Sequence, residues 1–143
     1  MKKKIGILLL LDLVCLIMCI CMFGHFTKRQ KQKYYADRDN YITTTGVLIH
    51  IKPDDETGTL YLGFSEMDYA YDDINFKIIK ESYQIASKRG LDEKLKIGET
   101  VSFVSAPRYF GDGYVMPIVE FSIDGVEYLS FEEGYDNLQH WLA

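Results

Sequence analysis

The sequence predicts one N-terminal transmembrane helix followed by a mainly-β domain, a small antiparallel barrel with one inserted helix and a short C-terminal helix. Three observations predict this architecture. Ile5–Phe26 is an almost unbroken apolar run, several later segments alternate apolar and polar residues, and one segment between them has helical spacing. Alternation with period two is typical of half-buried strands.

The apolar run is long enough to form a membrane anchor. Ile5–Phe26 has 22 residues, and Asp12 is its one charged side chain. A helix of that length spans about 33 Å, enough to cross a hydrocarbon core of about 30 Å. Both of its flanks are basic, as expected for a single-pass span: Lys2, Lys3 and Lys4 precede it, and Lys28, Arg29, Lys31 and Lys33 follow it.

Three alternatives for this segment fit the residues less well. A cleaved signal peptide has a shorter apolar core and a small-x-small cleavage site, which the stretch CMFGHFTKRQ lacks. A lipoprotein signal has a small residue before its cysteine, whereas Cys15, Cys19 and Cys21 follow Val, Met and Ile. A buried core helix would not have lysine clusters at both ends. We therefore expect a basic tail (1–4), an uncleaved anchor (5–26), a basic and polar stalk (27–41) and an acidic β domain (42–143).

Charge separates the two halves of the chain. Residues 1–33 carry seven Lys/Arg and one Asp, whereas residues 34–143 carry nine Lys/Arg and twenty Asp/Glu, a net charge of −11. Nucleic acid is bound by neutralising phosphates, so we expect no nucleic-acid partner for so acidic a domain. The expected lipid partner is the bilayer around residues 5–26. The lysines of the short tail favour a cytoplasmic N-terminus and an extracytoplasmic domain in the cell membrane.

Two alternating runs predict the first hairpin. In TTTGVLIHIK, Val47, Ile49 and Ile51 share one face, and Leu48 lies on the other. After the turn-rich PDDETG, the run TLYLGF places its large apolar side chains on one face and Tyr61 on the opposite face.

A third strand and a helix follow. INFKII predicts a short strand, and KESYQIASKRGL predicts a helix with Tyr83 and Ala86 on its apolar stripe and Gly90 as its stop. KIGETVSFVSA returns to alternation, with Val101 and Phe103 facing inward.

The last strands form a second hairpin. Asp124-Gly125 is the strongest two-residue turn signal in the chain, and pairing Ile123 with Val126 puts Phe121 opposite Tyr128. Pro117 cannot donate to a ladder, so an edge or a bulge is expected there. The final YDNLQHWLA predicts a short helix that docks through three apolar side chains, Leu138, Trp141 and Leu142.

Five strands with a helix between the third and fourth have the order of an OB-like barrel. This is a likeness of topology alone, because no family motif accompanies it. An SH3-like barrel or an open curved sheet is the alternative.

The most site-like stretch, RYFGDGYVMPIV, is interpreted as a turn. A dinucleotide loop needs a third glycine and a following helix, and a calcium loop needs several oxygen ligands, whereas only Asp112 is available here. Gly111-Asp112-Gly113 between two alternating runs suits a tight hairpin. No pair of histidines has metal-ligand spacing, so no metal site and no cofactor are expected. If a divalent cation binds, the sequence places it at Asp68, Asp72 and Asp73.

Tyrosines in predicted loops suggest a binding surface. The chain has eleven tyrosines, and aromatic side chains give large contact areas at low entropic cost. The residues expected to bind a ligand or partner are Tyr61, Tyr69, Tyr71, Arg108, Tyr109 and Tyr114. We therefore predict a membrane-anchored, non-enzymatic interaction module for a protein, a peptide or a glycan. One alternative is a hydrolase that uses paired carboxylates, and the other is a structural subunit of a membrane complex.

Overall fold

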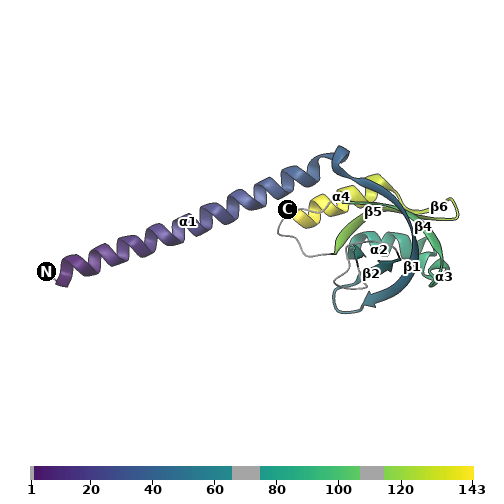
Figure 1. Cartoon of the computed structure of the whole chain (residues 1–143), viewed down its shortest axis with the longest axis horizontal. Helices are drawn as coiled ribbons and strands as arrows, with labels where there is room; N and C mark the ends of the chain where they lie inside the picture. The colour runs from purple at the N-terminus through teal and green to yellow at the C-terminus, as the bar shows by residue number, and fades with distance from the viewer. Residues whose placement is uncertain (1, 66–74, 107–114) are drawn as a thin grey trace. The chain divides into compact units, whose positions relative to one another are not determined.

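The computed structural model describes residues 2–65, 75–106 and 115–143 of the chain (Figure 1). The chain divides into two compact units, Met1–Tyr34 and Tyr35–Ala143, which are described separately. The described residues contain five helical segments: α1 Lys2–Ala36, the 3₁₀ turn η1 Arg38–Asn40, α2 Lys80–Lys88, α3 Leu91–Lys94 and α4 Phe131–Leu142.

Helix α1 forms the first unit and contributes its last two residues to the second. It is long and apolar enough to cross a membrane over Lys4–Ala36, as the sequence predicts for residues 5–26. The apolar side chains of this run, from Ile5 to Phe26, are exposed within the unit. The helix continues through most of the segment predicted as a stalk, and the second unit begins at Tyr35.

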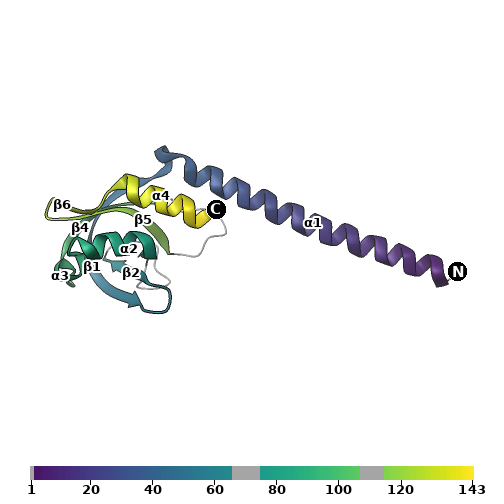
Figure 2. The ribbon, with the colours of Figure 1, turned by 180° about the vertical axis from the view of Figure 1, so that it is seen from behind.

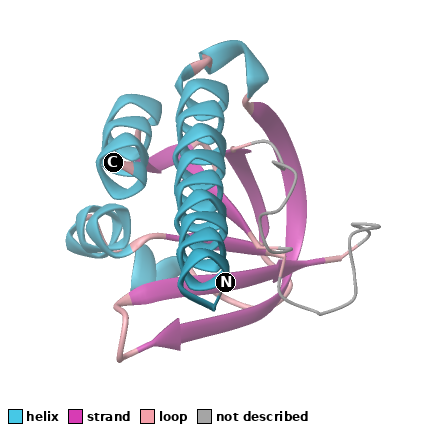
Figure 3. Ribbon diagram, turned by 90° about the vertical axis from the view of Figure 1, so that its left-hand side faces the viewer, coloured by secondary structure: helices cyan, strands magenta, loops and turns pink. Residues whose placement is uncertain are grey.

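The second unit is a closed five-strand mixed β-barrel with an extra strand and a C-terminal helix (Figure 3). The strands run in the order β3-β2-β1-β4-β5-β6, and a parallel pairing of β3 with β5 closes the barrel. The other neighbours are antiparallel. The strands are β1 Ile42–Asp54, β2 Thr59–Phe64, β3 Phe76–Ile78, β4 Thr100–Ser105, β5 Met116–Ile123 and β6 Val126–Leu129.

The inward face of β1 differs from the predicted one. Leu48 is fully buried in the barrel, whereas Val47 and Ile49 are exposed by 38% and 37%. The pairing of β1 with β2 shifts between Leu48 and His50, and this bulge returns Ile51 to the core side. The prediction that Val47, Ile49 and Ile51 share one face was therefore wrong, because one extra residue exchanges the two faces of a strand.

The β5–β6 hairpin confirms the predicted turn but not the whole predicted register. Asp124 and Gly125 have φ values of 52° and 75°, as a type I′ turn requires, and Ile123 pairs with Val126. A bulge follows, so Phe121 pairs with Leu129 instead of Tyr128. The turn fixes the register only up to the first irregularity.

Pro117 lies in a strand that is paired on both sides. Its residue partner in β3 is Lys77, and its carbonyl accepts a hydrogen bond from the Ala106 amide. The expected irregularity is a bulge opposite Val104 and Ser105, not an edge of the sheet. The predicted turn Gly111-Asp112-Gly113 lies outside the described residues.

Two apolar cores hold the unit together. The larger fills the barrel and includes Leu62, Phe103 and Phe121. The smaller lies between the outer face of the barrel and α4, and contains Val119 and Leu138. Strand β5 is therefore buried on both faces.

Helices α2 and α4 lie side by side on the outside of the barrel (Figure 2). The predicted helix is α2, in which Ala86 is buried and Tyr83 is packed against the core; it stops before Gly90, whose φ is 87°. Helix α4 begins with a capping box between Ser130 and Glu133. The N-terminal cap explains why α4 starts four residues before the predicted segment.

Candidate functional site

Of the residues predicted to bind a ligand, the described part of the chain contains Tyr61. Five others lie outside the described residues, as do the three candidate cation ligands: Tyr69, Tyr71, Arg108, Tyr109, Tyr114, Asp68, Asp72 and Asp73. The geometry of the candidate site is therefore built from Tyr61 outward.

Tyr61 is the centre of a row of side chains that crosses three strands. It faces outward from β2, because its neighbours Leu60 and Leu62 point into the barrel core. Its partner on β1 is Lys52, and its partner on β3 is Lys77. Directly paired residues project to the same side of a sheet, so two lysines flank the tyrosine ring on the outer surface.

A groove lies over Tyr61 and Lys77 of this row. It has a volume of about 290 Å³, and β2, β3, the β1–β2 loop, the start of α2 and the end of α4 all contribute to it. Its walls include Thr57, Tyr61, Lys77, Lys80, Glu81 and Trp141. We call it the Tyr61 groove.

The β1–β2 loop is folded tightly at one end of the groove. The Asp54 carboxylate accepts hydrogen bonds from the Glu56 amide and the Thr57 hydroxyl, and the Gly58 amide donates to the Asp54 carbonyl. The bonds to the carboxylate lower the pKa of Asp54, the bond from the Thr57 hydroxyl most of all. Gly58 has a φ of 71°, which L side chains rarely adopt, and a Cβ there would lie 3.0 Å from the Lys80 stem.

Trp141 forms the wall of the groove on the α4 side. Its side chain is 52% exposed, and Lys77 Nζ lies 4.7 Å from its ring centroid. A lysine at this distance is attracted by the face of the ring. The prediction that Trp141 docks into the domain alongside Leu138 was wrong. Leu138 is fully buried and Leu142 packs against the smaller core, whereas Trp141 points to the lysine of β3.

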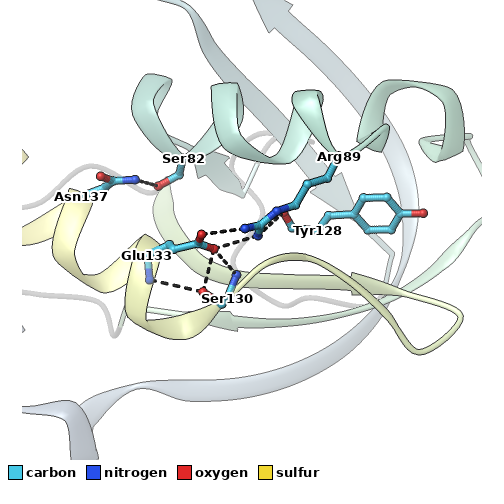
Figure 4. Close-up of polar contacts among 6 residues, drawn as sticks. All are labelled: Ser82, Arg89, Tyr128, Ser130, Glu133 and Asn137. Carbon is cyan, nitrogen blue, oxygen red and sulfur yellow. Dashed lines mark hydrogen bonds and ion pairs between the residues drawn. The ribbon is translucent and has the colours of Figure 1, made fainter.

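A set of polar contacts joins α2 to α4, the helix that carries Trp141 (Figure 4). Arg89, just after α2, donates two hydrogen bonds to the Glu133 carboxylate, at 2.7 and 2.8 Å. At the other end of the pair, the Asn137 amide donates to the Ser82 hydroxyl at 3.2 Å. The two helices are therefore antiparallel, and the end of α4 meets the start of α2.

Glu133 serves both the cap and the ion pair. Its pKa is lowered to about 2, first by the hydrogen bonds from Arg89 and then by those from Ser130. The Arg89 guanidinium also donates to the Tyr128 carbonyl, which ties the helix pair to β6. Glu133 therefore remains ionised over the physiological pH range.

A second depression adjoins the groove. Its volume is about 410 Å³, and Glu81, Asn137, His140 and Trp141 line it. Glu81 and Trp141 line both depressions, so the two adjoin where the start of α2 meets the end of α4.

The arrangement of this surface suits binding by side-chain contacts. Among the described residues, no three His, Cys, Asp or Glu side chains lie close enough to hold a metal ion. Partial burial and the neighbouring Glu127 raise the pKa of Glu120, but neither residue lines the two depressions. The groove offers aromatic faces, ammonium groups and threonine hydroxyls.

Sequence reasoning missed Lys52, Lys77 and Trp141 as neighbours of Tyr61. The lysines become neighbours only through the pairing of three strands, and the Trp141 position depends on how α4 packs. One signal was present: Ser130-x-x-Glu133 is a capping-box pattern that predicts the start of α4. Comparisons of the chain with protein-family models, with curated proteins and with solved structures gave no match.

Proposed function

We propose that this chain is a single-pass membrane protein whose barrel is a non-enzymatic binding module. In this proposal α1 anchors the protein in the cell membrane, and the barrel lies on the extracytoplasmic side. The partner binds in the Tyr61 groove.

The composition of α1 supports the anchor. Its apolar run is bounded by basic residues on both sides, and lysines flanking a span are favoured at the membrane surface. A cytoplasmic N-terminus keeps the three tail lysines on the side where positive charge is retained.

The order of the strands supports an OB-like barrel. Strands β1, β2 and β3 precede α2, strands β4 and β5 follow it, and β3 pairs with β5. In OB-like barrels, the outer face of the second and third strands and the loop after the first strand form the binding surface. Tyr61, Lys77 and Thr57 occupy these positions here.

The single observation that carries the proposal is the row Lys52–Tyr61–Lys77, in which Tyr61 and Lys77 share one groove with Trp141. Residues 34–143 form an acidic domain with nine Lys/Arg in all. Three of the nine lie at this one surface: Lys52, Lys77 and Lys80. Aromatic and basic side chains together in a concave site are typical of binding surfaces.

Photo-crosslinking in intact membranes tests the binding function. A photoreactive amino acid in place of Tyr61 is expected to capture a partner, and the same amino acid in place of Glu127 on β6 is the matched control. Glu127 is exposed and lines neither depression. Equal capture at both positions, or capture at neither, would exclude the groove as the binding surface.

A further inference from the structure

Lys52, which lies beside the Tyr61 groove, and the groove residues Tyr61, Lys77 and Trp141 present cations and rings in alternation. Neighbouring strands lie about 4.8 Å apart, so the Lys52 and Lys77 backbones are separated by about 10 Å with Tyr61 between them. Trp141 continues the row, with its ring 4.7 Å from Lys77 Nζ. A ligand that follows this row meets a cation, a ring, a cation and a ring in turn.

The backbone around Tyr61 offers no edge to an extended peptide. β2 is hydrogen-bonded to β1 on one side and to β3 on the other, and β3 is also paired with β5. Addition of a peptide strand to the sheet is therefore blocked at this face. Recognition must come from side chains.

The charge of the domain limits the charge of the ligand. Residues 34–143 carry a net charge of −11, which repels a dense polyanion such as single-stranded nucleic acid. Glu81 lines the groove beside Lys80 and adds to this repulsion. The lysines of the row instead suit single, well-separated anionic groups, which each pair with one ammonium group.

From these contacts we infer that the ligand is an acidic saccharide in which carboxylate-bearing sugars alternate with neutral ones. This inference rests on the proposed binding function of the groove. A sugar ring has an apolar face of C–H groups that packs on an aromatic ring, whose face is electron-rich. Tyr61 supplies such a face, and the half-exposed Trp141, with Lys77 over one side of its ring, supplies a second on the other side. The lysines pair with the carboxylates, and Thr57 and Thr59, which line the same groove, reach sugar hydroxyls.

The chain contains a single tryptophan, so its fluorescence reports directly on the groove. The full-length protein in detergent micelles is titrated with an oligosaccharide of alternating glucuronate and N-acetylglucosamine. The expected result is a saturable change in Trp141 emission. A neutral oligomer of N-acetylglucosamine and oligo-dT are the comparison ligands, and both are expected to bind at least about tenfold more weakly. The neutral oligomer lacks the carboxylates that pair with the lysines, and the dense negative charge of oligo-dT is repelled by the acidic domain.

Variants assign the response to the row. Replacing both lysines (Lys52→Ala with Lys77→Ala) should weaken the acidic saccharide at least about tenfold, and Tyr61→Ala should weaken it while Tyr61→Phe retains it. The matched control is Lys94→Ala with Lys96→Ala, which changes the net charge equally at exposed positions outside the groove and should leave binding unchanged.

Two results would overturn the inference. One is the absence of any Trp141 response to the acidic saccharide, and the other is an equal or stronger response to oligo-dT. If Tyr61 crosslinking still captures a protein partner in either case, the binding function stands and only the ligand class fails. If crosslinking at Tyr61 also fails, the proposed function falls with it.

Discussion

The Val119 carbonyl oxygen lies where the side chain of residue 134 would begin. A Cβ built on Gly134 would come within 1.9 Å of that oxygen and 2.5 Å of the carbonyl carbon. Helix α4 therefore rests directly on the backbone of β5, and Gly134 is the residue that permits this approach.

Gly134→Ala is expected to destabilise the domain although alanine favours helices. The new methyl group meets backbone that cannot rotate away, so α4 must move from β5, at a cost of about 1–3 kcal/mol or more. The free energy of unfolding in urea, followed by circular dichroism, measures this loss. Asp136→Ala, an exposed position of the same helix, should change it by no more than about 0.5 kcal/mol. Equal stability of the two variants would contradict the close packing of α4.

The second unit should need the last residues of α1. Tyr35 is 3% exposed and belongs to the smaller core, and its carbonyl accepts hydrogen bonds from Tyr41 and Gln139. A fragment that begins at Tyr35 should therefore be more stable than one that begins at Ile42, by at least the roughly 1.5–3 kcal/mol of burying one large side chain. Thermal unfolding of the two fragments checks this. Identical melting temperatures would place the domain boundary at Ile42 instead.

Acid should weaken the α2–α4 contact. The pKa of Glu133 is lowered to about 2 in the folded chain, against about 4.3 for an unperturbed glutamate. A group whose folded pKa is depressed stabilises the fold above the unfolded pKa, and this contribution is lost as the pH falls from about 4.5 towards 2. Glu133→Gln should therefore remove part of the fall in stability over this window.

Glu132 provides the comparison for this pH dependence. It forms an ion pair with Arg38, which also lowers its pKa, but its side chain is 65% exposed. Exposed ion pairs contribute little because water screens them. Glu132→Gln should leave the pH profile of stability close to that of the unaltered chain. A larger effect at Glu132 than at Glu133 would contradict the assignment of Glu133 as the main contact.

Orientation in the membrane is tested by protease added to intact cells. The proposal expects the acidic domain to be cleaved from outside, while a tag on the N-terminus stays protected. The reverse pattern would place the barrel in the cytoplasm and would remove extracellular saccharides as its ligands.

The sequence predicted the elements of the barrel because each depends on local patterns. Alternation indicated the strands, and Asp124-Gly125 fixed a turn with two positive φ values. The errors have one physical origin. A bulge adds one residue to one side of a pair, which put Ile51 on the same face as Leu48 and moved the partner of Phe121 to Leu129. Bulges leave no clear signal in a single sequence.

The candidate site was less predictable than the fold. Tyr61 could be placed on an outward face from alternation alone. Its pairing with Lys52 and Lys77 depends on the exact register of three strands, and the Trp141 contact depends on the tight approach of Gly134 to β5. A tryptophan on a short terminal helix is expected to dock into the domain. Here Leu138 and its neighbours fill the smaller core, and Trp141 lies outside it.

Extraction of membranes with alkaline carbonate tests the anchored module most directly, because the proposed partner and side of the membrane both depend on the anchor. The unprocessed full-length chain should remain in the membrane pellet, and a chain that lacks residues 2–34 should be released to the supernatant. Release of the intact, unprocessed chain, or its recovery only in a form shortened at the N-terminus, would contradict the account.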